Sequence, residues 1–135
     1  MKAMLILACA FVIATAAAIA HQSATERQPS WSAPPDADAT SNPLVNRKDT
    51  VAGGGKLFQQ RCSVCHGDDG SGNKRGPNLT LGSVQRQTDG ALFWKISSGN
   101  TRTGMPSFSF LPRAQRWQLV QHLRALAEST RTTGQ

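Results

Sequence analysis

Hydrophobic and polar positions divide this 135-residue chain into three parts. An almost unbroken apolar run covers residues 3–20, residues 21–41 have no apolar period, and helical spacing of apolar residues begins near residue 49. Apolar residues three and four positions apart indicate one buried helix face, and strand-type alternation is absent from the sequence. The pattern predicts an all-α domain over residues 42–131, followed by a C-terminal tail, 132–135.

The first helix of this domain is expected near Asp49 and Thr50, where either side chain can cap it, and it leads to Cys62. It contains the run Gly53–Gly55, and each glycine costs about 1 kcal/mol of helix stability relative to alanine. The run therefore predicts either a close approach of another helix at one glycine or a later helix start at Lys56.

Two further helices are expected. The middle one opens at Thr88–Gly90 and buries Leu92, Phe93 and Ile96. The last one begins at Pro112, a residue suited to the first helical position, and its buried face is Leu119, Val120, Leu123, Leu126 and Ala127. Between them lie long loops over residues 67–82 and 97–108. A domain of about 85 residues buries a small core, and long loops in it need something to organise them.

The first 20 residues resemble an export signal. Lys2 supplies the positive start, residues 3–20 the apolar stretch, and Ala18-Ile19-Ala20 a small-x-small cleavage site. Two alternatives remain open: a retained membrane anchor, because the apolar stretch is nearly long enough to span a bilayer, and a lipoprotein that uses Cys9. Each reading places the protein outside the cytoplasm, in the periplasm or otherwise exported.

Residues 21–41 are rich in Ser, Ala, Thr, Pro and Asp, and Pro34-Pro35 lies in their middle. This composition predicts a flexible leader. Trp31 is its one large apolar residue, and three fates are open for it: docking on the domain, docking on a partner, or loose attachment.

The positive charge lies in the domain. Residues 51–135 hold 11 Lys or Arg and 4 Asp or Glu, a net charge of +7, whereas residues 21–50 carry −1. Export and the scatter of the basic residues argue against nucleic acid as a partner. A positive face that steers encounters with an acidic protein is favoured, and a merely soluble basic surface is the alternative.

If Cys9 is removed with the signal, the mature chain keeps only the two cysteines of Cys62-Ser63-Val64-Cys65-His66. C-x-x-C-H is the attachment motif of c-type haem. Two thiols on one helical turn can each add to a vinyl group of the same porphyrin, and the adjacent imidazole can bind its iron. The alternatives are a zinc knuckle, which usually needs two further ligands, and a thioredoxin-like redox disulfide, which needs βαβ patterning.

Two residues are candidates for a second ligand of a haem iron. Met105 is the only methionine left after signal removal, 39 residues beyond His66, in the loop Gly104-Met105-Pro106. A thioether is a competent soft ligand for haem iron, although a methionine can also fill a gap in the core. His122 on the last helix is the second candidate.

Over residues 42–128 the chain resembles the class I c-type cytochromes. The resemblance rests on Gly54 or Gly55 with Phe58, the C-x-x-C-H motif, residues 76–79, 92–96 and 104–108, and the helix 117–126. It implies an all-α cytochrome c fold of three to four short helices and long loops wrapped around one covalent haem. It also implies thioethers at Cys62 and Cys65, His66 and Met105 as iron ligands, and the Pro77 carbonyl as acceptor of the His66 N–H. The family often has an aromatic residue where this chain has His122.

The function expected is that of a one-electron carrier, a monomer and not an enzyme, between a periplasmic donor and an acceptor such as a dehydrogenase or terminal oxidase. Candidate docking charges are Lys56, Lys74, Arg75 and Arg102. One alternative is an electron-transfer subunit of a dehydrogenase complex. Another, a small haem peroxidase or gas sensor, requires an open sixth site on the iron.

Overall fold

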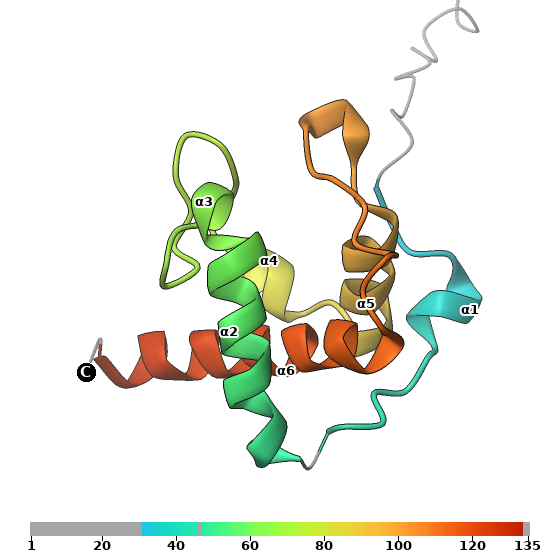
Figure 1. Ribbon diagram of the computed structural model, residues 1–135, viewed down its shortest axis with the longest axis horizontal. Helices are drawn as coiled ribbons and strands as arrows, with labels where there is room; N and C mark the ends of the chain where they lie inside the picture. The colour runs from blue at the N-terminus through green and yellow to red at the C-terminus, as the bar shows by residue number, and fades with distance from the viewer. Residues whose placement is uncertain (1–30, 46, 134–135) are drawn as a thin grey trace, which may run out of the picture. The chain divides into compact units, whose positions relative to one another are not determined.

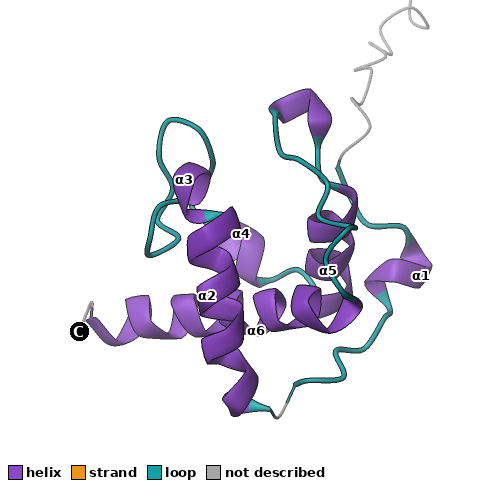
Figure 2. Cartoon of the chain, in the orientation of Figure 1, coloured by secondary structure: helices purple, strands orange, loops and turns teal. Residues whose placement is uncertain are grey.

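The computed structural model describes residues 31–45 and 47–133. Its main helices are α2 (Val51–Arg61), α5 (Asp89–Ser98) and α6 (Arg113–Thr133). Three one-turn helices, α1 (Pro35–Asp38), α3 (Ser63–His66) and α4 (Gly82–Gln85), and two 3₁₀ turns, η1 (Lys48–Thr50) and η2 (Thr101–Thr103), lie between them. Among the described residues the only β-type pairings are two isolated bridges, so the predicted all-α class is confirmed. Long loops join α3 to α4 and α5 to α6 (Figure 2).

Helix α2 crosses α6 (Figure 1). The helices touch at Gly54: a Cβ built on this residue would fall on the backbone carbonyl of Gln118 and 3.0 Å from the Cβ of His122. The helix begins at Val51 and includes all three glycines, so the alternative of a later start at Lys56 is wrong. The close approach of another helix that the glycine run predicts occurs at Gly54. His122 packs at this crossing, with its ring 5.1 Å from that of Phe58.

The expected cap of this helix is wrong. The Asp49 carboxylate pairs with the Arg47 guanidinium at 2.8 Å, and the Thr50 hydroxyl donates to the Arg47 carbonyl at 2.6 Å. Both side chains are thus engaged in the turn η1, and neither accepts from an N–H of α2. The helix is instead entered directly from a 3₁₀ turn, an alternative way to satisfy its first N–H groups.

The core lies where α2, α5 and α6 meet. The predicted faces of α5 and α6 are confirmed, except that Leu126 is only partly buried. The buried cluster is Phe58, Leu92, Phe93, Ile96, Phe108, Leu111, Trp117, Leu119, Val120 and Leu123. Phe93 stacks on Trp117 with ring centroids 4.1 Å apart. Side chains from three helices far apart in the sequence, and from the loop before α6, thus contribute to a single core.

A flexible leader is expected over residues 21–41, but its described part, residues 31–41, packs on the domain. The folded unit begins at Trp31, and α1 packs on α5. The Thr88 hydroxyl, which caps α5, donates to the Asp38 carbonyl at 2.8 Å. The amino-acid composition could not predict this packing, because the contacts are made by backbone carbonyls and one indole and not by a periodic row of apolar side chains. Residues 21–30, the expected signal peptide and Cys9 lie outside the described residues.

Helix α6 begins directly after Pro112 and continues to Thr133, beyond the expected start of the tail at residue 132. Among the residues that the structure describes, no helix is both long enough and apolar enough to cross a membrane.

Candidate functional site

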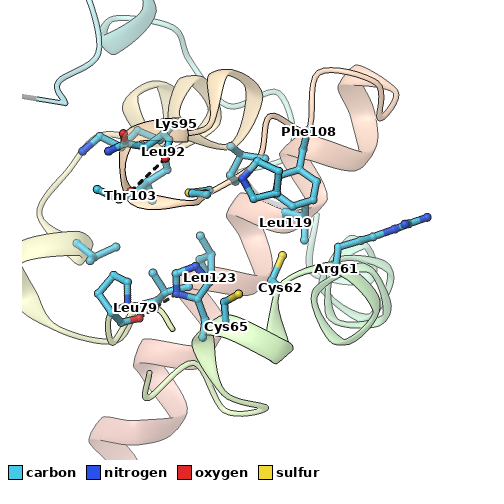
Figure 3. A pocket seen from close by; sticks show the side chains of 18 of the residues that line it. Arg61, Cys62, Cys65, Leu79, Leu92, Lys95, Thr103, Phe108, Leu119 and Leu123 are labelled. Atoms are coloured by element: carbon cyan, nitrogen blue, oxygen red, sulfur yellow. Dashed lines mark hydrogen bonds between the residues drawn. The ribbon is translucent and has the colours of Figure 1, made fainter. Parts of the chain in front are cut away.

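A cavity of about 410 Å³ lies between α3, α5, α6 and the loops that carry Pro77 and Met105 (Figure 3). Most of its lining is apolar. The apolar lining residues include Trp31, Phe58, Pro77, Leu79, Val84, Leu92, Ile96, Met105, Pro106, Phe108, Leu119 and Leu123. A cavity of this size and character is typical of a site for a small molecule or cofactor.

Both cysteines face this cavity. Cys62 is the residue just before α3 and Cys65 lies within it, so the single turn between them sets both thiols on one side. Figure 3 shows the two sulfur atoms rising from the same wall. Neither cysteine is in a disulfide. The pair can therefore bond to two neighbouring positions of one bound group.

The Cys62 thiol does not have the properties of a redox nucleophile. Burial, and to a smaller extent the neighbouring Cys65, raises its pKa from 9.0 to about 11. Reactive cysteines of C-x-x-C redox sites have a lowered pKa, because the thiolate is the attacking species. The electrostatic environment thus argues against the thioredoxin-like alternative.

The zinc alternative needs four ligands arranged as a tetrahedron. Within residues 31–45 and 47–133, no group of three or more His, Cys, Asp or Glu side chains is positioned to hold a metal ion.

His66 has its tautomer defined by a hydrogen bond. Its Nδ1 lies 2.9 Å from the Pro77 carbonyl oxygen, the bond expected from the resemblance. A carbonyl can only accept, so Nδ1 carries the proton and Nε2 keeps a lone pair for a metal. Gly76 permits the approach of this loop, because a Cβ there would lie 2.8 Å from the Cys65 carbonyl oxygen. Such a bond orients an imidazole ligand and raises its basicity.

Met105 lines the cavity from a loop that is held by backbone hydrogen bonds. Its N–H donates to the Asn100 carbonyl at 3.0 Å, and the Asn100 N–H donates to the Met105 carbonyl at 2.9 Å. Three residues on, the Phe108 N–H donates to the Ile96 carbonyl of α5 at 3.1 Å. These hydrogen bonds fix the position of the loop that carries the Met105 thioether. His122 is not among the residues that line the cavity.

These groups fit a covalently bound haem. The cavity offers apolar walls for the porphyrin, two thiols for its vinyl groups, an imidazole with a free Nε2 and a thioether. A sequence profile of one protein family, described as cytochrome c oxidase, cbb3-type, subunit III, matches residues 49–123. The chain belongs to this family of class I c-type cytochromes.

Membership confirms the cytochrome c fold and electron transfer as its general function. Cytochromes of this kind carry covalent haem, exchange electrons with partner proteins, are typically carriers rather than enzymes, and generally lie outside the cytoplasm. Among curated proteins, none matches this cytochrome.

The sequence did not place Arg61 or Lys95 at the cavity, and it left open whether Trp31 docks on the domain; all three line the cavity. The Lys95 ammonium lies 4.8 Å from the centre of the Trp31 ring. Arg61 extends outward from the cavity rim (Figure 3), and its guanidinium lies 5.9 Å from the ring of Phe110, which is 65% exposed. The lone tryptophan in a polar leader was the one sequence signal for any of them.

Proposed function

We propose that this protein is an exported monohaem cytochrome c that carries single electrons between a periplasmic donor and an acceptor such as a dehydrogenase or a terminal oxidase. One observation supports it above all. A single apolar cavity is lined by both thiols of C-x-x-C-H, by His66 in the tautomer that leaves Nε2 free, and by Met105.

In this proposal Cys62 and Cys65 attach the haem, and His66 and Met105 bind its iron. The haem supplies the change between Fe(II) and Fe(III). The bond from His66 to Pro77 holds the imidazole in orientation, and the paired bonds between Asn100 and Met105 hold the thioether. Both ligands can therefore stay in place in either oxidation state, so little rearrangement accompanies electron transfer. A thioether ligand and an apolar pocket both raise the reduction potential.

Surface charge supports an acidic partner. Lys56, Lys74, Arg75 and Arg102 are exposed, and the ion pairs among the described residues involve only Arg47 and Arg124. Unpaired exposed cations steer association with a negatively charged surface, and this effect falls as ionic strength rises. The rate of reduction by a physiological donor should accordingly fall with added salt.

Met105→Ala tests the proposal, with the exposed Leu81→Ala as control. The wild-type holoprotein should have a positive reduction potential, show the thioether–iron charge-transfer band when oxidised, and bind carbon monoxide poorly. Met105→Ala should lose the band, lower the potential and gain carbon monoxide binding, while Leu81→Ala changes none of these. A wild-type protein without the band that binds carbon monoxide readily would favour a peroxidase or gas sensor instead.

A second candidate is an electron-transfer subunit of a larger complex, such as a dehydrogenase. The family description, which names an oxidase subunit, favours this possibility. Co-purification from the native membrane and periplasm distinguishes the two candidates. A stoichiometric complex supports the subunit, and a monomer free of other chains supports the diffusing carrier.

A further inference from the structure

Residues 31–42, which we call the N-terminal strap, run along α5 and lie outside the matched family region, which begins at residue 49. The strap is attached at both ends. Near its start, the Trp31 indole N–H donates to the Gly99 carbonyl at 3.0 Å. At its end, the Asn42 amide donates to Asp89 at 2.7 Å, and Asp89 also pairs with Arg124 of α6 at 2.6 Å.

Gly90 of α5 makes room for the middle of the strap. A Cβ on this residue would collide with the carbonyl of Ala37 and lie 2.7 Å from that of Thr40 and 2.8 Å from that of Asp38. Three backbone groups of the strap thus converge on a position where any side chain would displace them. The strap is therefore tightly packed against α5.

Trp31 brings the strap to the cavity, where its indole forms part of the wall. It lies over the ammonium of Lys95, an α5 residue that also lines the cavity. A cation over an indole face is stabilised by the ring quadrupole. Lys95 forms no ion pair within the described residues, and burial lowers its pKa below the ordinary value. The wall of the cavity therefore includes a residue whose positive charge is partly desolvated.

We propose that the N-terminal strap is a haem cover in which Trp31 closes the cavity wall and holds the Lys95 ammonium beside the haem. The inference rests on the haem site proposed above. A closed wall excludes water, and a nearby cation opposes the extra positive charge of ferric iron. Both effects favour Fe(II) and raise the reduction potential. Because Trp31 positions Lys95, the two residues act as one unit.

A double-mutant cycle on the full-length holoprotein tests this inference: Trp31→Ala, Lys95→Met and the double variant, measured by spectroelectrochemical titration. Trp94→Phe is the control, because Trp94 neighbours Lys95 on α5 but does not line the cavity. Each single variant should shift the potential to a lower value, and the double variant should shift it by less than the sum. Shifts no larger than that of Trp94→Phe, or strictly additive shifts, would overturn the inference.

Gly90→Ala provides a test that leaves the cavity residues unchanged. It should displace the strap and lower the potential in the same direction as Trp31→Ala. Gly53→Ala, where the nearest atom is the flexible end of Gln118, should leave the potential unchanged. A Gly90→Ala potential equal to wild type would overturn the role of the strap. In both experiments the thioether–iron band of the wild-type protein checks the proposed function separately, since its absence contradicts the haem ligation and not the cover.

Discussion

The crossing of α2 and α6 depends on the missing side chain of Gly54, so Gly54→Ala should destabilise the protein. The added Cβ would fall on the backbone carbonyl of Gln118. That carbonyl lies inside α6, where it cannot rotate away without breaking a helical hydrogen bond. The helices must therefore separate, and Phe58, which is 1% exposed beside the crossing, would lose packing.

Two effects of opposite sign set the size of the loss. Overpacking costs about 1–3 kcal/mol, and the upper end applies because the obstacle is backbone rather than a side chain. Alanine recovers about 1 kcal/mol of helix propensity relative to glycine. The net expectation is a loss of about 2 kcal/mol in the free energy of unfolding, roughly a 30-fold change in the folding equilibrium.

Gly53→Ala is the matched control, one position away in the same helix. Its Cβ would lie 3.1 Å from the Oε1 of Gln118, the end of a flexible side chain. The propensity gain should then dominate, and the variant should be as stable as wild type or up to about 1 kcal/mol more stable.

Guanidinium denaturation of the oxidised holoproteins, followed by helical circular dichroism, measures the difference. The proposed thioether bonds would keep the haem on the unfolded chain, so loss of the cofactor would not distort the comparison. Equal slopes with shifted midpoints would report stability alone. If Gly54→Ala proves as stable as Gly53→Ala, the close approach at Gly54 does not govern the crossing.

Three further predictions concern other parts of the molecule. Burial lowers the pKa of His122, whose Nε2 has no hydrogen-bond partner. At this residue the unfolded chain therefore binds more protons than the folded protein, and stability should fall as the pH drops through about 6.5. Denaturation midpoints measured over a pH series should show this fall for wild type and a smaller fall for His122→Phe. Arg124→Met removes the ion-pair partner of the partly buried Asp89, which keeps its hydrogen bond from Asn42. The variant should cost about 1–3 kcal/mol, which thermal unfolding at constant pH will show; an unchanged midpoint would mean that the pair is dispensable. Cys62→Ala should leave one thioether, seen as a changed pyridine haemochrome spectrum with haem still attached, and a wild-type spectrum would contradict attachment through Cys62.

Local features of the chain were readable from the sequence. The turn that sets Cys62, Cys65 and His66 together spans five residues, so spacing alone brings these groups to one side. The buried faces of α5 and α6 follow helical periodicity and were correctly predicted. The prediction of a helix cap at Asp49 or Thr50 was wrong for a local reason, because the Arg47 guanidinium pairs with Asp49 and the Arg47 carbonyl accepts from Thr50.

Non-local features could not be obtained in this way. The choice of Gly54 among three adjacent glycines depends on where α6 passes, which no single helix encodes. The position of Trp31 depends on its indole hydrogen bond to the Gly99 carbonyl and on the packing of strap carbonyls against Gly90. Neither contact produces a periodic pattern in the sequence.

By itself, the sequence determined the chemistry: two thiols and an imidazole on one turn, a lone loop methionine and an all-α domain too small to organise its own loops. Covalent spacing and helical periodicity decide these, since both act within a few residues. The tertiary structure alone decided the geometry: the Pro77 carbonyl lies within hydrogen-bond distance of His66, Met105 lines the same cavity, and Trp31 forms part of its wall. Each of these needs two distant segments at hydrogen-bonding or van der Waals distance, a condition that the packing of helices sets.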